Sequence, residues 1–365
     1  MAYSHNAPFR ADVVGSYLRP AELKAAREDF AAGKIDAAAL KAVEDKAITE
    51  LVAKQKAAGL HVITDGEFRR GWWHFDFMWG FNGVDHAAAA HRVAFHDEVT
   101  PADTATVTGR ISGENHPFVE HFKFVKVLEG EGQVARQTIP APIQTFSEVT
   151  LDRCDGQQES LRAVYKTDEE LADAIAAAYR TVIADLYAAG CRNIQFDDCT
   201  WGIYCDTDFV AKTGMSPVDL QKVSELGVAL NNAAIADKPD DLVINTHVCR
   251  GNYHSTYAFE GGYDPVAPYL FANENVEEKK FASGNQRFLN IKHRMYANMA
   301  GFHSVTRFFD GIMYIAVVMV GALFLISDNP VMKLTATLWR SSCMSPRCWP
   351  PFAASWSSPS PSSAA

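Results

Sequence analysis

His247 and Cys249 stand two positions apart at the end of an apolar segment, residues 242–249, that is predicted to be a strand. In an extended strand, residues i and i+2 project to the same side, so the imidazole and the thiol are expected to converge. Both groups are zinc ligands, and a catalytic zinc keeps one position open for water or substrate. The pair therefore predicts half of a zinc site. The alternative is simple packing, because free cysteine is among the most buried residue types.

Other polar side chains stand where further strands are predicted to end: Ser16, Asp65, Glu67, Asp197 and Asp198. In barrels of parallel strands, catalytic residues lie at the carboxyl ends, where the loops form a single mouth. Carboxylates at such a mouth could bind the ammonium group of an amino acid. These positions are the candidate site.

The elements that must position these residues recur along the chain. Helical, alanine-rich sequence ends at Gly59 and again at Gly190, and each time an apolar strand with an acidic end follows. Residues 11–17 and 242–249 read as further strands, the latter after a helical segment at 224–237. Alternating strands and helices favour a parallel α/β fold, and we predict a (β/α)₈ barrel.

Residues 82–124 interrupt this alternation with polar, histidine-bearing sequence. The stretch is too long for a routine loop between a strand and a helix. We predict an inserted hairpin or lid.

Four segments resemble, in order and spacing, the catalytic-domain motifs of the zinc-dependent, cobalamin-independent methionine synthase family. They are VVGSYLRP (13–20), ITDGEFRRGWW (63–73), IQFDDCTWG (194–202) and INTHVCRGNYHS (244–255), and the resemblance covers about residues 9–271. It is nearest to the short, single-barrel members. It implies a zinc enzyme that moves a methyl group from 5-methyltetrahydrofolate, often polyglutamylated, to homocysteine.

The resemblance also implies roles for individual residues. His247 and Cys249 match two of the four metal-site residues, Ser16 and Glu67 match residues that hold homocysteine, and Asp197 matches a carboxylate that binds its amino group. Each has a structural alternative. Ser16 could cap the following helix, Glu67 could pair with Arg69 or Arg70, and Asp197 could simply end a strand.

A basic and aromatic cluster follows Glu67, comprising Arg69, Arg70, Trp72, Trp73 and His74. Cations attract the carboxylates of a polyglutamate tail, and flat rings stack on a pterin. Candidate folate-binding residues are therefore Arg69, Arg70, Trp72 and Trp73. The alternative is a purely structural cluster.

The family's catalytic acid and its two remaining zinc ligands belong to the last third of the barrel, which this chain does not match. Glu277 and Glu278 do not fit the family pattern, and Cys343 and Cys348 lie in a Ser- and Pro-rich tail. The catalytic acid is therefore unassigned. We expect an incomplete barrel, with its last strands missing and its activity in question.

The sequence changes character near Phe271. We predict three parts: a methionine synthase-like barrel over 1–270, a segment over 271–329 resembling a transmembrane fragment of an ATP-binding-cassette exporter, and a disordered tail over 330–365. The apolar run 308–326 nearly reaches the roughly 20 residues of a spanning helix. Membrane insertion and burial in a core are both open.

Charge and cysteine content exclude other classes. A formal net charge of -10 and a pI near 5.6 leave no overall basic surface, so we expect no nucleic-acid partner. The seven cysteines are scattered, and the amino terminus carries no apolar signal segment, so a cytoplasmic setting is expected, with membrane association only through 308–326.

Two other functions remain open. One is a different zinc or acid–base enzyme of similar barrel architecture, such as a decarboxylase. The other is a non-catalytic, membrane-associated fusion product dominated by the apolar segment 308–326.

Overall fold

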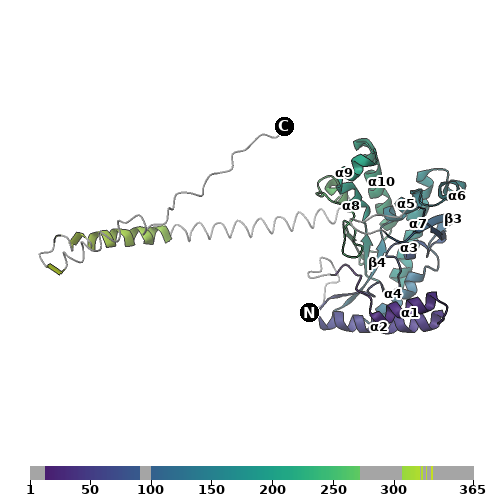
Figure 1. Ribbon diagram of the computed structural model, residues 1–365, viewed down its shortest axis with the longest axis horizontal. Coiled ribbons are helices and arrows are strands. Elements are labelled where there is room, and N and C mark those ends of the chain that lie inside the picture. The colour runs from purple at the N-terminus through teal and green to yellow at the C-terminus, as the bar shows by residue number, and fades with distance from the viewer. Residues whose placement is uncertain are drawn as a thin grey trace. The chain divides into compact units, whose positions relative to one another are not determined.

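The structure is a computed structural model that describes residues 13–90, 100–271, 306–320, 322–323, 326 and 330–331. The chain divides into two compact units, Met1–Glu278 and Lys279–Ala365. The first unit contains the strands and the helices α1 to α11 (Figure 1).

A parallel sheet of four strands forms the centre of the first unit. Its order is β1-β4-β5-β6, with β1 at Val62–Ile63, β4 at Val134–Pro140, β5 at Asn193–Asp197 and β6 at Val243–His247. A parallel bridge between Ser16 and Gly66 brings the amino-terminal segment alongside the end of β1. The predicted parallel α/β class is confirmed. The described strands form an open sheet, so closure of a barrel is not seen among them.

Helices alternate with these strands, as the recurring sequence pattern predicts (Figure 1). They are α1 (Ala21–Ala31), α2 (Ala37–Ala57), α3 (Phe75–Met78), α4 (Pro117–Lys126), α5 (Pro142–Thr150), α6 (Gln157–Val164), α7 (Asp168–Ala188), α8 (Thr200–Cys205), α9 (Thr207–Lys212), α10 (Pro217–Ile235) and α11 (Ala267–Leu270). Side-chain caps fix several starts. Thr167 accepts from the N–H of Glu170 at α7, and Ser216 forms a reciprocal capping box with Asp219 at α10.

The predicted insertion is confirmed as a hairpin. Strands β2 (Asn82–Ala88) and β3 (Asp103–Ser112) pair antiparallel in a separate sheet, with an irregularity between Asn82 and Val84. The hairpin is anchored on the main unit through buried Val84, Ala105 and Val107. It is therefore an integral part of the core.

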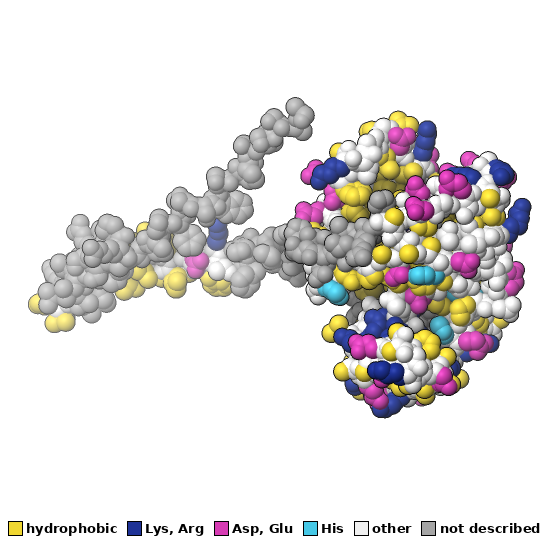
Figure 2. Space-filling view, turned by 45° about the vertical axis from the view of Figure 1, so that its right-hand side comes forward, with side chains coloured by type: hydrophobic (Ala, Val, Ile, Leu, Met, Phe, Trp, Pro, Cys, Tyr) yellow, Lys and Arg dark blue, Asp and Glu magenta, His cyan; other side chains and the backbone are white. Residues whose placement is uncertain are grey.

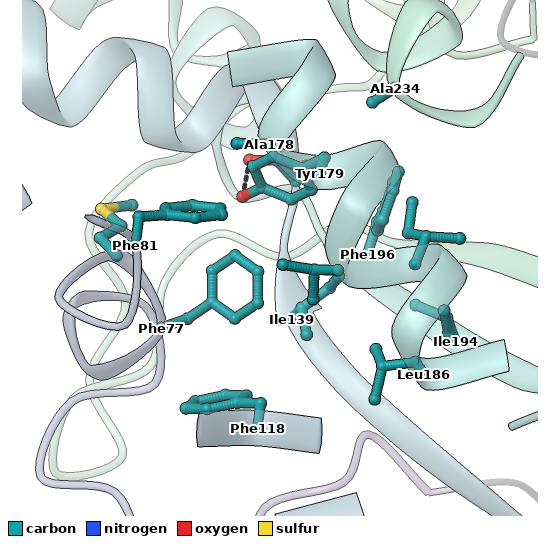
Figure 3. Close-up of a cluster of buried hydrophobic side chains, with 14 of the residues drawn as sticks. Phe77, Phe81, Phe118, Ile139, Ala178, Tyr179, Leu186, Ile194, Phe196 and Ala234 are labelled. Carbon is teal, nitrogen blue, oxygen red and sulfur yellow. Dashed lines mark hydrogen bonds between the residues drawn. The ribbon is translucent and has the colours of Figure 1, made fainter. Parts of the chain in front are cut away.

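An aromatic cluster packs between the sheet and its covering helices (Figure 3). Phe77, Phe118 and Tyr179 are at most 1% exposed and approach one another with ring centroids 5.2 and 5.3 Å from Phe77. Ile139 of β4 and Phe196 of β5 pack against the same cluster. The Tyr179 hydroxyl lies 2.7 Å from the Thr145 hydroxyl and donates to the Pro140 carbonyl at 2.9 Å, so its polar end is satisfied.

Strand β5 is buried on both faces, and the two faces differ in character. Ile194 and Phe196 pack on the helices, whereas Asn193, Gln195 and Asp197 face the other way. Arg136 of β4 donates to the side chains of Asn193 at 2.5 Å and Gln195 at 3.0 Å. A buried polar network of this kind fixes the register of two neighbouring strands.

The surface of the first unit carries both signs of charge. On the face seen in Figure 2, Asp and Glu side chains are interspersed with Lys and Arg. Several form exposed pairs, such as Lys34 with Asp29 at 2.8 Å and Lys46 with Glu22 at 3.0 Å. Such pairs contribute little to stability, because water screens them.

His116 begins α4 as a neutral buried side chain. Its Nδ1 accepts from the N–H of Phe118 at 3.2 Å, and its Nε2 lies 2.9 Å from the carbonyl of Phe77. A Cβ on Gly80 would lie 2.6 Å from this Nε2, so Gly80 leaves the room that the ring needs. Burial is the main cause that lowers the pKa of His116 from 6.5 to about 4.

His116 makes the stability of the fold depend on pH. Below about pH 6.5 the unfolded chain binds a proton that the folded state rejects, so the free energy of unfolding falls as the pH drops from 6.5 toward 4. We expect His116→Asn, which keeps a capping acceptor, to flatten this fall in urea titrations at a series of pH values. An equal slope in the variant and the parent would contradict this assignment.

The second unit contains a helix over residues 306–320 whose apolar side chains are exposed, including Phe308 at 65% and Met313 at 63%. A spanning helix at 308–326 is not confirmed, because no helix in the described parts of the chain is both long and apolar enough to cross a membrane. Residues 321, 324 and 325 lie outside those parts. Most of the segments 271–329 and 330–365 lies outside the described residues.

Candidate functional site

Five polar side chains meet the carboxyl edge of the parallel sheet. Ser16 forms a bridge with Gly66 beside the end of β1, and Glu67 directly follows Gly66. Thr138 lies in β4, Asp197 is the last residue of β5, and His247 is the last residue of β6. Because the strands are parallel and adjacent, their ends lie on one edge. This is the region in which parallel α/β folds bind their ligands.

Glu67 is buried at this edge and held from several directions. It is 6% exposed, and its Oε1 accepts from Thr138 Oγ1 at 3.0 Å and from Arg70 Nη1 at 3.3 Å. Burial raises the pKa of Glu67, with Arg70 opposing that shift and the carboxylates of Asp197 and Asp65 adding to it. The structural alternative of pairing with Arg70 is confirmed. The charge of Asp197 also acts on Glu67, so the ion pair with Arg70 does not exclude Glu67 from binding a ligand.

The backbone around Glu67 is in an uncommon conformation. Gly66 has φ +67° and Glu67 has φ 58°, and positive φ costs energy in a residue other than glycine. A Cβ on Gly66 would lie 2.3 Å from Leu51 Cδ2, so only glycine fits. The N–H of Glu67 donates to Asp65 Oδ1 at 2.8 Å, which closes the turn. The fold thus accepts strain where it places this carboxylate.

Asp197 and His247 form the closest pair of the site. They occupy matched positions in the pairing of β5 with β6, and His247 Nδ1 lies 2.8 Å from Asp197 Oδ1. Gln195 Nε2 donates to the same oxygen at 2.8 Å. Burial disfavours a charged imidazole. The hydrogen bond and the charge of Asp197, together with the charges of Cys249 and Glu67, outweigh burial and raise the pKa of His247 above 6.5.

Cys249 lies just past the end of β6, which stops at His247. The prediction that His247 and Cys249 share one extended strand is therefore wrong, because the chain has left the sheet before it reaches the thiol. The charge of each still shifts the pKa of the other: Cys249 raises that of His247, and His247 lowers that of Cys249. The partner that Cys249 touches is Cys199, with the two sulfurs 3.2 Å apart.

Hydrogen bonding distinguishes the two thiols. The hydrogen bond from Cys199 is the largest cause that lowers the pKa of Cys249 from 9.0 to about 6, and the N–H of Gly251, which donates to its sulfur at 3.4 Å, adds to this shift. The sequence reasoning missed Cys199, although it follows the acidic end of β5 just as Cys249 follows His247.

Ser16 is exposed beside this edge. The alternative that it caps the following helix is excluded, because α1 begins after Pro20 and has no side-chain cap. Tyr17 N–H donates to the Gly66 carbonyl at 3.1 Å, and Thr64 Oγ1 donates to the Gly15 carbonyl at 2.7 Å. These bonds hold Ser16 next to the Gly66–Glu67 turn.

The basic and aromatic cluster divides in two. Arg69 pairs with Glu44 at 3.1 Å and with Asp45 of α2, and Arg70 is 1% exposed and donates to the Thr138 carbonyl at 2.7 Å. Both guanidinium groups thus have partners within the fold. Trp72 and Trp73 are half-buried, and Trp72 Nε1 donates to Asp103 of the hairpin at 2.9 Å.

The donor types at this edge suit zinc, but their number falls short. A catalytic zinc has three protein ligands. Within the residues that the structure describes, no group of three or more His, Cys, Asp or Glu side chains is arranged to hold a metal ion. His247 engages Asp197 through Nδ1, the carboxylate contact typical of histidine ligands in metal sites. Glu277, Glu278, Cys343 and Cys348 lie outside the described residues.

Comparisons with known proteins agree on one family. Residues 9–93 match the family model described as the cobalamin-independent synthase catalytic domain. The uncharacterized protein YxjH of Bacillus subtilis is 39% identical over 274 residues, which cover 74% of this chain and 69% of that protein. A methionine synthase of Sulfolobus acidocaldarius is 28% identical over 241 residues, covering 66% of this chain and 61% of that enzyme.

A solved structure agrees with these sequence matches. The crystal structure of a Listeria monocytogenes protein described as a candidate vitamin B12-independent methionine synthase is 38% identical, with a TM-score of 0.54. The match covers 68% of this chain and 67% of that protein. About a third of each of these relatives therefore has no counterpart in the matched part of this chain.

Proposed function

The chain belongs to the cobalamin-independent methionine synthase family, and on that premise we propose that it handles homocysteine on zinc as acceptor of a methyl group from 5-methyltetrahydrofolate, polyglutamylated or not. The observation that carries the proposal is the approach of Asp197 to His247 at 2.8 Å, with Glu67 and Cys249 close enough to shift the pKa of His247. These are the positions that match the family motifs.

His247 and Cys249 would hold the zinc in this proposal. With Nδ1 on Asp197, His247 has Nε2 left for a metal, and the low pKa of Cys249 favours the thiolate that metals bind. Zinc supplies one kind of chemistry here, which is to keep a bound thiol deprotonated near neutral pH. The family's two further ligands and its acid match none of the described residues.

The amino-acid part of homocysteine would lie between Asp197, Glu67 and Ser16. Two acidic side chains close together bind a cation well, and both face the same edge. Ser16 offers an exposed hydroxyl beside them. Burial around Asp197 and Glu67 strengthens an ion pair with an ammonium group, because little water competes.

The folate donor would stack on Trp72 and Trp73, with Arg69 and Arg70 contributing positive charge to its glutamates. Trp72 joins the main unit to the β2–β3 hairpin through Asp103, so the hairpin would border this part of the site. We infer further that the four strands are part of a (β/α)₈ barrel, since one face of β5 is apolar under helices and the other carries the Arg136 network.

Zinc and homocysteine binding test this proposal together. We expect the full chain to bind zinc more tightly when homocysteine is present, because a thiolate ligand completes the shell and the coupling is reciprocal. His247→Ala and Cys249→Ala should each weaken zinc binding by at least about tenfold, since each removes a direct ligand, and changes to outer-shell partners alone already cost 10–100-fold. Competition with a chromophoric chelator would measure this.

Cys154→Ala is the matched control, because Cys154 is also partly exposed and its sulfur contacts the Gln157 amide oxygen at 3.7 Å, away from the candidate site. Its zinc affinity should equal that of the parent. Parental zinc affinity in both His247→Ala and Cys249→Ala would refute the ligand assignment.

A further inference from the structure

Cys199 and Cys249 are placed as a matched pair by the sheet. Asp197 and His247 are direct partners in the β5–β6 register, and each cysteine follows its strand end by two residues. Neighbouring strands lie about 4.8 Å apart, and disulfides join residues whose Cα atoms are about 4.4–6.8 Å apart. The sulfurs are already within 3.2 Å.

Local packing holds both sides of this pair in place. A Cβ on Gly202 of α8 would lie 2.2 Å from the carbonyl oxygen of Cys249, so α8 and the segment after β6 are in direct backbone contact. The N–H of Asp198 donates to the His247 carbonyl at 2.8 Å, which continues the strand pairing one step toward the thiols. Little rearrangement is needed to bring the sulfurs to bonding distance.

Among the described cysteines, these two combine partial exposure with a neighbouring thiol. Cys199 and Cys249 are partly exposed, so a small oxidant can reach them. Cys191 is 0% exposed and Cys205 is 1% exposed. Cys154 is partly exposed, but its sulfur contacts the Gln157 amide oxygen at 3.7 Å and no described thiol is its neighbour.

We propose that Cys199 and Cys249 form a reversible disulfide when the protein meets a peroxide. One sulfur attacks a peroxide oxygen, the O–O bond breaks, and a sulfenic acid and one water result. The second thiol then displaces the sulfenic oxygen as water, and the S–S bond forms. The two cysteines lose two electrons and two hydrogens in all, and a dithiol reductant restores them by exchange.

The disulfide would act on the proposed function, and this consequence rests on it. Cys249 is the proposed zinc ligand, and a thiolate is the form that binds metal. Once its sulfur is bonded to that of Cys199, the thiolate no longer exists. Oxidation would therefore release zinc, and reduction would restore binding.

Peptide mapping of the full chain tests the proposal without metal or substrate. The protein is stripped with a chelator, treated with hydrogen peroxide, alkylated in denaturant and digested without reductant. We expect a cross-linked pair of peptides carrying Cys199 and Cys249, lighter than the free pair by two hydrogens, that disappears after dithiothreitol. Cys199→Ser should abolish this species, and Cys154→Ser should leave it unchanged.

Three outcomes would overturn the proposal: alkylated Cys199 and Cys249 after peroxide, oxidation of Cys249 to sulfinic acid without a cross-link, or a cross-link from either residue to another cysteine. None of them depends on whether zinc or homocysteine binds. A failure of the disulfide is therefore distinguishable from a failure of the proposed function. Zinc release that follows the cross-link in time would support the link between the two.

Discussion

Replacing Arg70 by Met is expected to lower the free energy of unfolding by about 3–5 kcal/mol. Arg70 is 1% exposed, and its guanidinium donates to the Thr138 carbonyl at 2.7 Å, to Thr138 Oγ1 at 3.0 Å and to Glu67 at 3.3 Å. Met fills a similar volume but donates nothing, so the Glu67 carboxylate stays buried beside Asp197 without its cation. Urea titration at neutral pH measures the loss.

A double variant separates the lost ion pair from the lost packing. Glu67→Gln in the Arg70→Met background removes the unpaired charge, so it should recover part of the stability and show a favourable coupling between the two positions. Arg162→Met is the matched surface control, because the pair of Arg162 with Asp168 is 40% and 53% exposed, and it should leave the urea midpoint unchanged. A loss in Arg70→Met no larger than in this control would contradict the account.

Asp197→Asn is expected to weaken homocysteine binding by roughly 30-fold or more, the effect of truncating one partner of a buried charge pair. The substitution is nearly isosteric, and the amide oxygen can still accept from His247 and from Gln195, which lie 2.8 Å from Asp197 Oδ1. What it removes is the charge that faces the proposed ammonium group. Isothermal titration calorimetry with zinc-loaded protein gives the dissociation constants.

The des-amino analogue of homocysteine is the control for this experiment. It carries the thiol and the carboxylate but no ammonium group, so its affinity should differ little between the parent and Asp197→Asn. Equal losses for homocysteine and its analogue would mean that Asp197 acts only by positioning His247. The assignment of Asp197 to the amino group would then be wrong.

The existence of β1, β5 and β6 could be predicted because each is an apolar run that ends in polar residues, although β6 ends at His247 and not at Cys249. Strand β4 was not predicted, although it lies between β1 and β5. Its sequence VARQTIP places the polar side chains of Arg136 and Thr138 on one face. Such side chains are buried only when residues of other elements accept their hydrogen bonds, and the strand's own sequence does not show those residues. Arg136 is 4% exposed, and the side chains of Asn193 and Gln195 and the Val13 carbonyl accept hydrogen bonds from it.

The thiol pair shows a second limit of the sequence. The two-residue spacing of His247 and Cys249 suggested a shared strand face, but the strand ends at His247 and the register across β5 and β6 decides what Cys249 touches. Cys199 and Cys249 are 50 positions apart along the chain. Only the pairing of Asp197 with His247 brings them together, and pairing register is a tertiary property.

The residues of the basic and aromatic cluster can be recognised in the sequence, but the partners that each of them contacts cannot. Arg69 turns to Glu44 and Asp45 of α2, whereas Arg70, one position later, enters the core beside Glu67. Alternate directions follow from the tight turn that begins at Gly66 and Glu67. Sequence neighbours thus serve different parts of the fold.

The central claim is that His247 and Cys249 bind zinc at an edge where Asp197 and Glu67 bind the rest of homocysteine. X-ray absorption at the zinc edge of the loaded full chain tests it most directly. The account predicts one protein sulfur at about 2.3 Å, lost in Cys249→Ala, and one added sulfur when homocysteine binds. A spectrum with only nitrogen and oxygen neighbours, unchanged by homocysteine, would contradict it.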